Sequence, residues 1–183
     1  GDTITIPSGA TLDGSNATLS GFATTNGITE ADQWRLSANT NQGSNADITS
    51  NWERPDDTGY GRIGTGLTES SGIFSFPSTG IYKVEIFYSF INNSAGDEDR
   101  VQILINVTTN NSSYTSHFEA DAAVDGSANG AANVAAGSTL IDVTDTSNVK
   151  VKFTAQSFKS GTTLNGSSVL NRTAFTFIRL GDT

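Results

Sequence analysis

The stretch GIFSFPSTGIYKVEIFYSF (residues 72–90) places a tight turn before a strand with two apolar faces. Successive side chains of a strand point to opposite sides of a sheet. From residue 82 to residue 90 the even positions are all apolar, whereas the odd positions begin with Lys83 and Glu85 and become apolar at Phe87 and Ile91. The even face is therefore predicted to enter the core of the domain. We expect Phe87 and Ile91 to contact a second surface.

The composition favours a single domain of short strands and turns. The chain has 183 residues, and its 19 glycines stand in a background rich in Ser, Thr and Asn. This length is sufficient for one sizeable core. No apolar run has the length of a membrane span, so we expect no membrane insertion. Cysteine is absent, which excludes disulfides and thiolate sites.

The charge balance argues against a nucleic-acid partner. Ten Lys and Arg residues stand against 19 Asp and Glu residues, which gives a formal net charge of −9. Proteins that follow a phosphate backbone need clustered cations. We therefore expect the partners to be proteins or glycans.

Strand patterns recur from residue 33 to the end of the chain. The predicted strands are residues 33–37, 72–76, 81–91, 100–108, 114–120, 138–143, 149–158 and 173–180, and shorter pieces are expected near Trp52 and at 62–67. No segment has a convincing helical period. The sequence predicts an all-β, antiparallel sandwich of two sheets.

The first 28 residues differ from the rest. The motif ATLDG at residues 10–14 returns as ATLSG at residues 17–21. Such short apolar rungs cannot bury themselves alone, so they need other copies or the domain behind them. We interpret residues 1–28 as an extended stem or linker and residues 29–183 as a head domain.

The lengths of the connections predict where a ligand would bind. In an antiparallel sandwich, successive connections lie at alternating ends. The long ones gather near residues 92–99, 121–133 and 159–171, which predicts elaborate loops at the end opposite the chain termini. Tyr60 lies between glycines in another long connection. The candidate binding residues are Asn92, Asn93, Asp97, Glu98, Asp99, Asp121, Asp125, Asn129, Lys159, Asn165 and Tyr60.

Several residues of this chain resemble a known family. The spacing of Leu67, Phe74, Gly80 and Tyr82 is similar to the aromatic and glycine signature of the globular head of the complement first-component q subunit, a jelly roll shared with tumour necrosis factor. The chain departs from that signature at Val84 and Ile86, where aromatics are usual, and at Arg62, where Asn or Asp is usual.

The resemblance implies a homotrimer. The closing segment AFTFIRLGDT (residues 174–183) resembles the last, central strand of such heads. Heads of this type form trimers with the termini at the base. This places Phe87 and Ile91 near the three-fold contact, and Phe175 and Phe177 are further candidates for that interface.

A second resemblance concerns biology. The segments at residues 4–21, 28–36, 51–66 and 72–82 resemble stems and C-terminal heads of bacteriophage tail-fibre and virion surface proteins, especially those of marine cyanophages. The resemblance implies a virion surface protein, extracellular when it functions, that joins other virion proteins through its N-terminal stem.

The residues that could carry chemistry do not form a catalytic motif. His117 is the single histidine, and no nucleophile motif accompanies it. The many acids offer no basis for selecting a hydrolytic pair. Asp97 and Asp99 could bind Ca²⁺ as hard oxygen ligands, but a solvated charged turn is the favoured interpretation. We therefore expect no enzyme and no obligatory cofactor.

The sequence favours a fibre-tip or surface head that trimerises and binds a host cell-surface glycan or protein. A structural capsid-decoration or fibre trimerisation module without receptor binding is the alternative. A glycan hydrolase is the third.

Overall fold

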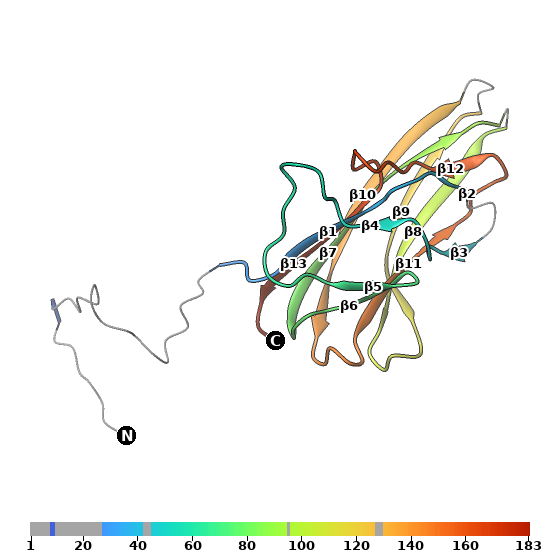
Figure 1. The fold of residues 1–183 in the computed structure, drawn as a ribbon. Helices are drawn as coiled ribbons and strands as arrows, with labels where there is room; N and C mark the ends of the chain where they lie inside the picture. Colours follow the sequence, from blue (N-terminus) through green and yellow to red (C-terminus); the bar gives the residue numbers. More distant parts are fainter. Residues whose placement is uncertain (1–7, 10–26, 42–44, 95, 127–129) are drawn as a thin grey trace.

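The computed structural model describes residues 8–9, 27–41, 45–94, 96–126 and 130–183. Thirteen strands and no helix occur in these ranges, so the described chain holds no helix that could cross a membrane. The strands form two antiparallel sheets that pack face to face as a jelly-roll sandwich (Figure 1). The predicted fold class is confirmed. Nearly all of the predicted stem, residues 1–28, lies outside the described residues, so the domain boundary stays a prediction.

The first sheet, sheet A, is built around the long strand β7. Its path is β2 (Thr40–Asn41), β12 (Thr162–Leu164), β7 (Gly80–Asn92), β13 (Ala174–Gly181), β1 (Ala31–Leu36) and β4 (Trp52–Glu53). Strand β10 (Ala131–Val143) pairs with the other edge of β7 along the whole strand, from Gly80 to Asn92. The predicted strand at 81–91 therefore pairs with three strands of this sheet, β10, β12 and β13.

The second sheet, sheet B, covers one face of sheet A. Its path is β5 (Thr68–Ser70), β6 (Ile73–Ser75), β11 (Lys150–Gln156), β8 (Glu98–Thr108) and β9 (Thr115–Val124), and β3 (Ala46–Asp47) also pairs with β11.

Aromatic rings fill the space between the sheets. Phe153 of sheet B lies 4.3 Å from Phe175 of sheet A, measured between ring centroids. Trp52 packs edge-on against Phe175 at 4.6 Å and against Phe74 at 4.8 Å. Phe177 is also fully buried in this cluster. Such rings supply large apolar areas and favour edge-to-face contacts, so this cluster joins the two sheets through buried apolar surface.

Gly80 is required where β7 begins. Its φ angle is +138°, a backbone conformation that residues with a side chain rarely adopt. A Cβ atom there would also lie 2.5 Å from the carbonyl oxygen of Gly181. The glycine of the signature thus allows β7 and the end of β13 to approach closely.

The Ala-rich segment at residues 121–137 corrects one expectation. It was predicted to be mostly a long connection, but β9 extends to Val124 and β10 begins at Ala131. Residues 131–137 of β10 pair with residues 86–92 of β7, and this pairing stabilises an extended backbone despite the low strand propensity of alanine.

Strands β9 and β10 meet where the two sheets close on each other. A Cβ atom on Gly137 would lie 2.1 Å from the ring of Phe118, so the absence of a side chain lets the aromatic ring pack against the β10 backbone. The sandwich is therefore closed along this side.

One edge of β7 is shared by two strands. Strand β13 pairs with β7 as far as Phe87, and β12 pairs with β7 from Phe90 onward. The connection between them, residues 165–173, leaves the sheet at Ser89. The backbone N–H of Asn165 donates to the Ser89 carbonyl at 2.9 Å, and the Ser89 N–H donates to the Thr173 hydroxyl at 3.3 Å. Both ends of this connection are thus fixed to one residue.

Candidate functional site

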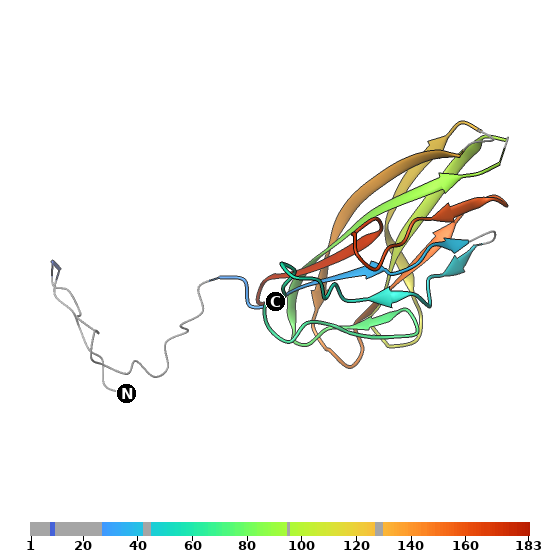
Figure 2. The ribbon, with the colours of Figure 1, turned by 45° about the horizontal axis from the view of Figure 1, so that its top comes forward.

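The end of the sandwich far from the chain termini is formed by three connections. They are β7–β8, β9–β10 and β11–β12, and they lie together at the top right in Figures 1 and 2, whereas the chain enters and leaves the head at the opposite end. We call this region the distal end. Two of the predicted long connections, near 92–99 and within 121–133, lie here. The third does so only over residues 157–161, because β12 then carries the chain away.

Polar contacts join the distal connections to each other. Lys159 donates to the carboxylate of Asp99 at 2.7 Å and to the carbonyl oxygen of Asp97 at 2.6 Å. The Asp97 carboxylate accepts the N–H of Gly126 at 2.7 Å. The hydrogen bond with Asp99 holds the pKa of Lys159 above its usual value. Lys159 therefore carries its charge at neutral pH and neutralises part of an acidic surface.

Two candidate binding residues have structural roles instead. Asn92 is buried, and its side chain bonds to the backbone of Ser94 at 2.9 Å and to Gly96 at 2.8 Å. Glu98 is fully buried, and its carboxylate accepts the backbone N–H of Lys159 at 2.9 Å as well as the hydroxyl of Thr162. Strand β7 ends at Asn92 and strand β8 begins at Glu98, so both residues lie in strands and not in the expected loop. Their side chains stabilise the distal end and are not free to bind a ligand.

Three further candidates lie away from the distal end. Asn165 donates its amide to the Ser89 hydroxyl at 2.8 Å beside β7. Asp121 is on the outer face of sheet B, 3.2 Å from Arg100. Tyr60 lies in the β4–β5 connection, 41 % exposed. The structure therefore brings together Asn93, Asp97, Asp99, Asp125 and Lys159, while Asn129 lies outside the described residues.

The described residues contain no group of three or more His, Cys, Asp or Glu side chains placed to hold a metal ion. Both proposed calcium ligands already accept a hydrogen bond. The Asp99 carboxylate accepts one from Lys159, and the Asp97 carboxylate accepts one from a backbone N–H. The geometry favours the interpretation as a charged turn. His117 is exposed on sheet B beside Ser116 and Glu119, and no hydrogen bond joins its ring to another described residue.

The outer face of sheet A is the second candidate surface. The even residues of β7 from Tyr82 to Phe90 are fully buried, so its odd residues point outward. Phe87 is 39 % exposed, and Leu140 and Val134 of the neighbouring β10 are 59 % and 52 % exposed. Ile91 shares this face and pairs with Ala132. Phe87 and Ile91 thus point outward as predicted.

The prediction for β13 is wrong in its choice of face. Phe175 and Phe177 are fully buried in the protomer's own core, where their backbone partners are the inward-facing Ile86 and Val84. Among the residues of β13 that point outward, Thr176 and Ile178 are partly exposed. They share the outer face with β7 and replace the two phenylalanines as candidate interface residues.

The outer face of sheet B is polar by contrast. Lys152 bonds to Asp47 at 2.7 Å, and Gln102 donates to Glu119 at 2.9 Å. These side chains and their neighbours form an extended polar layer over β8, β9 and β11. The two outer faces therefore differ sharply in chemistry.

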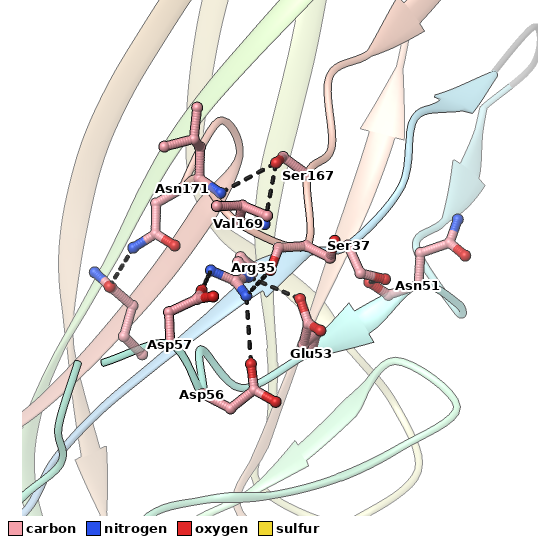
Figure 3. A network of polar contacts seen from close by, with 12 residues as sticks. Arg35, Ser37, Asn51, Glu53, Asp56, Asp57, Ser167, Val169 and Asn171 are labelled. Carbon is pink, nitrogen blue, oxygen red and sulfur yellow. Dashed lines mark hydrogen bonds and ion pairs between the residues drawn. The ribbon is translucent and has the colours of Figure 1, made fainter. Parts of the chain in front are cut away.

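A buried arginine, which the sequence analysis did not identify, holds two connections over β1. Arg35 is fully buried; it donates to Glu53 at 2.7 Å, to Asp57 at 2.9 Å and to the carbonyl oxygen of Ser168 (Figure 3). Burial lowers the pKa of Arg35, but the bonds to the two acids outweigh it and hold the pKa above its usual value. We call these residues, with Asp56 at 3.7 Å, the Arg35 cluster.

The Arg35 cluster fixes an exposed apolar turn. The Ser167 hydroxyl accepts the N–H groups of Val169 at 3.1 Å and Leu170 at 3.0 Å (Figure 3). These two side chains are 61 % and 55 % exposed. The acids at 53–57 were the available sequence signal, but nothing in the sequence links them to Arg35.

Comparisons with known proteins show the fold. No family model matches the sequence, and no curated protein matches it. A crystal structure of murine APRIL is similar with a TM-score of 0.56 and 12 % identity over 82 % of this chain and 98 % of that chain. A second one gives a TM-score of 0.55 and 13 % identity over the same shares. Eiger TNF from S. frugiperda gives 0.53 and 12 % over 84 % and 93 %. At these identities the likeness shows the fold alone, and that fold is the jelly roll of the tumour necrosis factor type.

Proposed function

We propose that the chain is a non-enzymatic homotrimeric head that assembles through the outer face of sheet A and binds a host cell-surface glycan or protein with its distal end. The observation that carries this proposal is the difference between the two outer faces. One carries exposed apolar side chains on adjacent strands, and the other is covered by a hydrogen-bonded polar layer.

The apolar face supports self-association. Phe87, Val134 and Leu140 lie on adjacent strands and are each more than a third exposed. Exposed apolar side chains gathered on one face of a sheet mark a candidate contact surface. Sheet B needs no such cover because its outward polar groups bond to each other.

The distal end supports recognition. Its connections lie away from the termini, so a partner joined through the N-terminal segment would leave them accessible (Figure 2). Small polar loops give weak individual contacts, and three copies on one head would raise the overall affinity through avidity. We further propose that the head belongs to a tail fibre or virion surface protein, on the basis of its sequence resemblance.

One observation favours the structural alternative. Lys159, Asp97 and Asp99 bond mainly to one another and to backbone groups of the same end. A head that serves only to trimerise a fibre or decorate a capsid would need no more than this.

The experiment measures both properties in the full chain. Sedimentation velocity at micromolar concentration is expected to give trimers, and compact monomers would contradict the proposed assembly. Fluorescently labelled protein is then tested for binding to a panel of candidate bacterial hosts and to a glycan array.

Matched variants locate the binding surface. We expect Asn93→Arg and Asp125→Arg at the distal end to reduce cell binding at least about tenfold, because each adds bulk and charge at the contact. Ser113→Arg and Thr144→Arg make the same change at exposed positions of the opposite end and are expected to bind normally. A trimer that binds no host and no glycan would instead support the structural alternative.

A further inference from the structure

An ion pair stands among the exposed apolar residues of the outer face of sheet A. Lys83 and Glu85 both point outward from β7, and the ammonium group of Lys83 bonds to the carboxylate of Glu85. Their cross-strand neighbours are known from the register. Lys83 lies between Ile178 and Leu140, and Glu85 lies between Thr176 and Ser138.

The next row of the face is apolar. Phe87 lies between Ala174 of β13 and Ala136 of β10. Strand β10 contributes one acid to the outer face, Asp142. It is exposed and pairs in register with Ile81, one row beyond Lys83. The ion pair therefore occupies the centre of the face, while Asp142 occupies its rim.

Lys83 and Glu85 are only partly covered in the protomer. Their side chains are 37 % and 43 % exposed. The bond between them satisfies one of the three donors of the ammonium group and one oxygen of the carboxylate. The remaining donors and lone pairs face water in the single chain.

Association through this face would remove that water. Burial of charges is costly unless their remaining hydrogen-bonding groups find partners. Apolar or neutral cover would leave both groups unsatisfied. A second copy of the same face carries the same two opposite charges, and it can satisfy them.

We infer that Lys83 and Glu85 form an alternating ring of ion pairs across the subunit interface, in which Lys83 of one copy bonds to Glu85 of the next. This inference rests on the proposed self-assembly through sheet A. In a cyclic assembly each subunit offers both charges, so every lysine finds a carboxylate of its neighbour.

The ring sets specificity more than affinity. The apolar rows at Phe87 and Leu140 would drive association of many copies in many registers, because apolar contact has no direction. A buried polar pair at one position penalises every register that leaves it unpaired. The ion pair therefore selects the alignment of the subunits.

Charge-reversal variants test the ring. In Lys83→Glu all central charges are negative, and in Glu85→Lys all are positive. We expect each single variant to raise the concentration of half-dissociation by about a hundredfold or more, since truncating or reversing one partner of a desolvated pair is strongly unfavourable. The double variant K83E/E85K retains one charge of each sign and is expected to assemble as the wild type does.

Mixing separates contacts between chains from contacts within one chain. When the K83E and E85K proteins are combined, native mass spectrometry is expected to show mixed oligomers at concentrations where each alone is monomeric, because at least two of the three contacts in a mixed trimer join opposite charges. The controls are Lys150→Glu and Glu119→Lys, which make the same charge changes on the outer face of sheet B and are expected to leave assembly unchanged.

The outcomes distinguish this inference from the proposed function. If the wild type forms trimers and both single reversals form equally stable trimers, the ring does not exist while the proposed assembly stands. If the single reversals dissociate but their mixture contains no mixed oligomers, the pair acts within one chain and the ring is refuted. If the wild type itself is monomeric, the proposed assembly fails.

Discussion

Replacing Arg35 by glutamine tests whether the Arg35 cluster stabilises the head. The substitution removes the charge that meets Glu53 at 2.7 Å and Asp57 at 2.9 Å, and it also removes the bond to the Ser168 carbonyl. The acids stay in place without their counter-charge.

The expected loss follows from the burial of each partner. Removal of one member of a buried ion pair costs about 3–5 kcal/mol. Arg35 itself is 0 % exposed, but Glu53 and Asp57 are 27 % and 36 % exposed and so retain contact with water. We therefore expect the lower end of the range, about 3 kcal/mol. For a domain of this size the melting temperature should fall by about 6–12 °C.

Thermal unfolding followed by circular dichroism measures this loss, with Arg100→Gln as the matched control. Arg100 also meets two acids, Glu119 at 3.3 Å and Asp121 at 3.2 Å, but its side chain is 54 % exposed. Surface pairs of this kind contribute about 0–1 kcal/mol. Amide exchange at Leu170 should also accelerate in the Arg35 variant, because the turn is held through Ser168. Equal melting temperatures in the two variants would refute the reasoning.

Three further predictions concern the core, the seam and pH. Phe175→Ala should destabilise the folded chain by about 3–5 kcal/mol in urea unfolding because it leaves a cavity between the sheets. Phe87→Ala should leave unfolding of the monomer nearly unchanged and weaken self-association in sedimentation. The reverse pattern would contradict the assigned faces. Gly137→Ala should cost about 1–3 kcal/mol, because the added methyl group overlaps the Phe118 ring, and an unchanged urea midpoint would contradict that contact. Burial raises the pKa of Tyr88 above its usual value. The stability that its neutral form contributes is therefore complete below about pH 10 and is lost as the pH rises further. Tyr88→Phe should flatten this alkaline decline of the melting temperature, and an identical decline in both proteins would contradict the role of Tyr88.

The alternation of residues 80–92 was sufficient to predict the long strand β7 and its inward face. A polar residue at every second position marks the outward side, and Lys83 and Glu85 supplied that mark. The segment at residues 174–180 supplies no such mark, because Phe175 and Phe177 alternate with Thr176 and Ile178, and large apolar residues occur on both faces. A period of two separates the faces without stating which one is buried. Only the register with β7 decides it.

The Arg35 cluster could not be predicted because its contacts are distant in sequence. Arg35 lies 18 residues from Glu53 and 133 residues from Ser168. No local pattern encodes such pairing. The candidate distal residues were predicted in part, since connection lengths place loops at one end of a sandwich, but strand ends could not be located closely enough to exclude Asn92 and Glu98.

The way residues 165–173 leave the sheet at Ser89 has a practical consequence for engineering. Their two ends are held beside one residue of β7 by the hydrogen bonds of Asn165 and Thr173. A longer excursion between fixed and adjacent ends adds little closure entropy, about 0.6 kcal/mol for each doubling of length. This excursion can therefore accept grafted foreign peptides while the register of β12 and β13 on β7 is preserved.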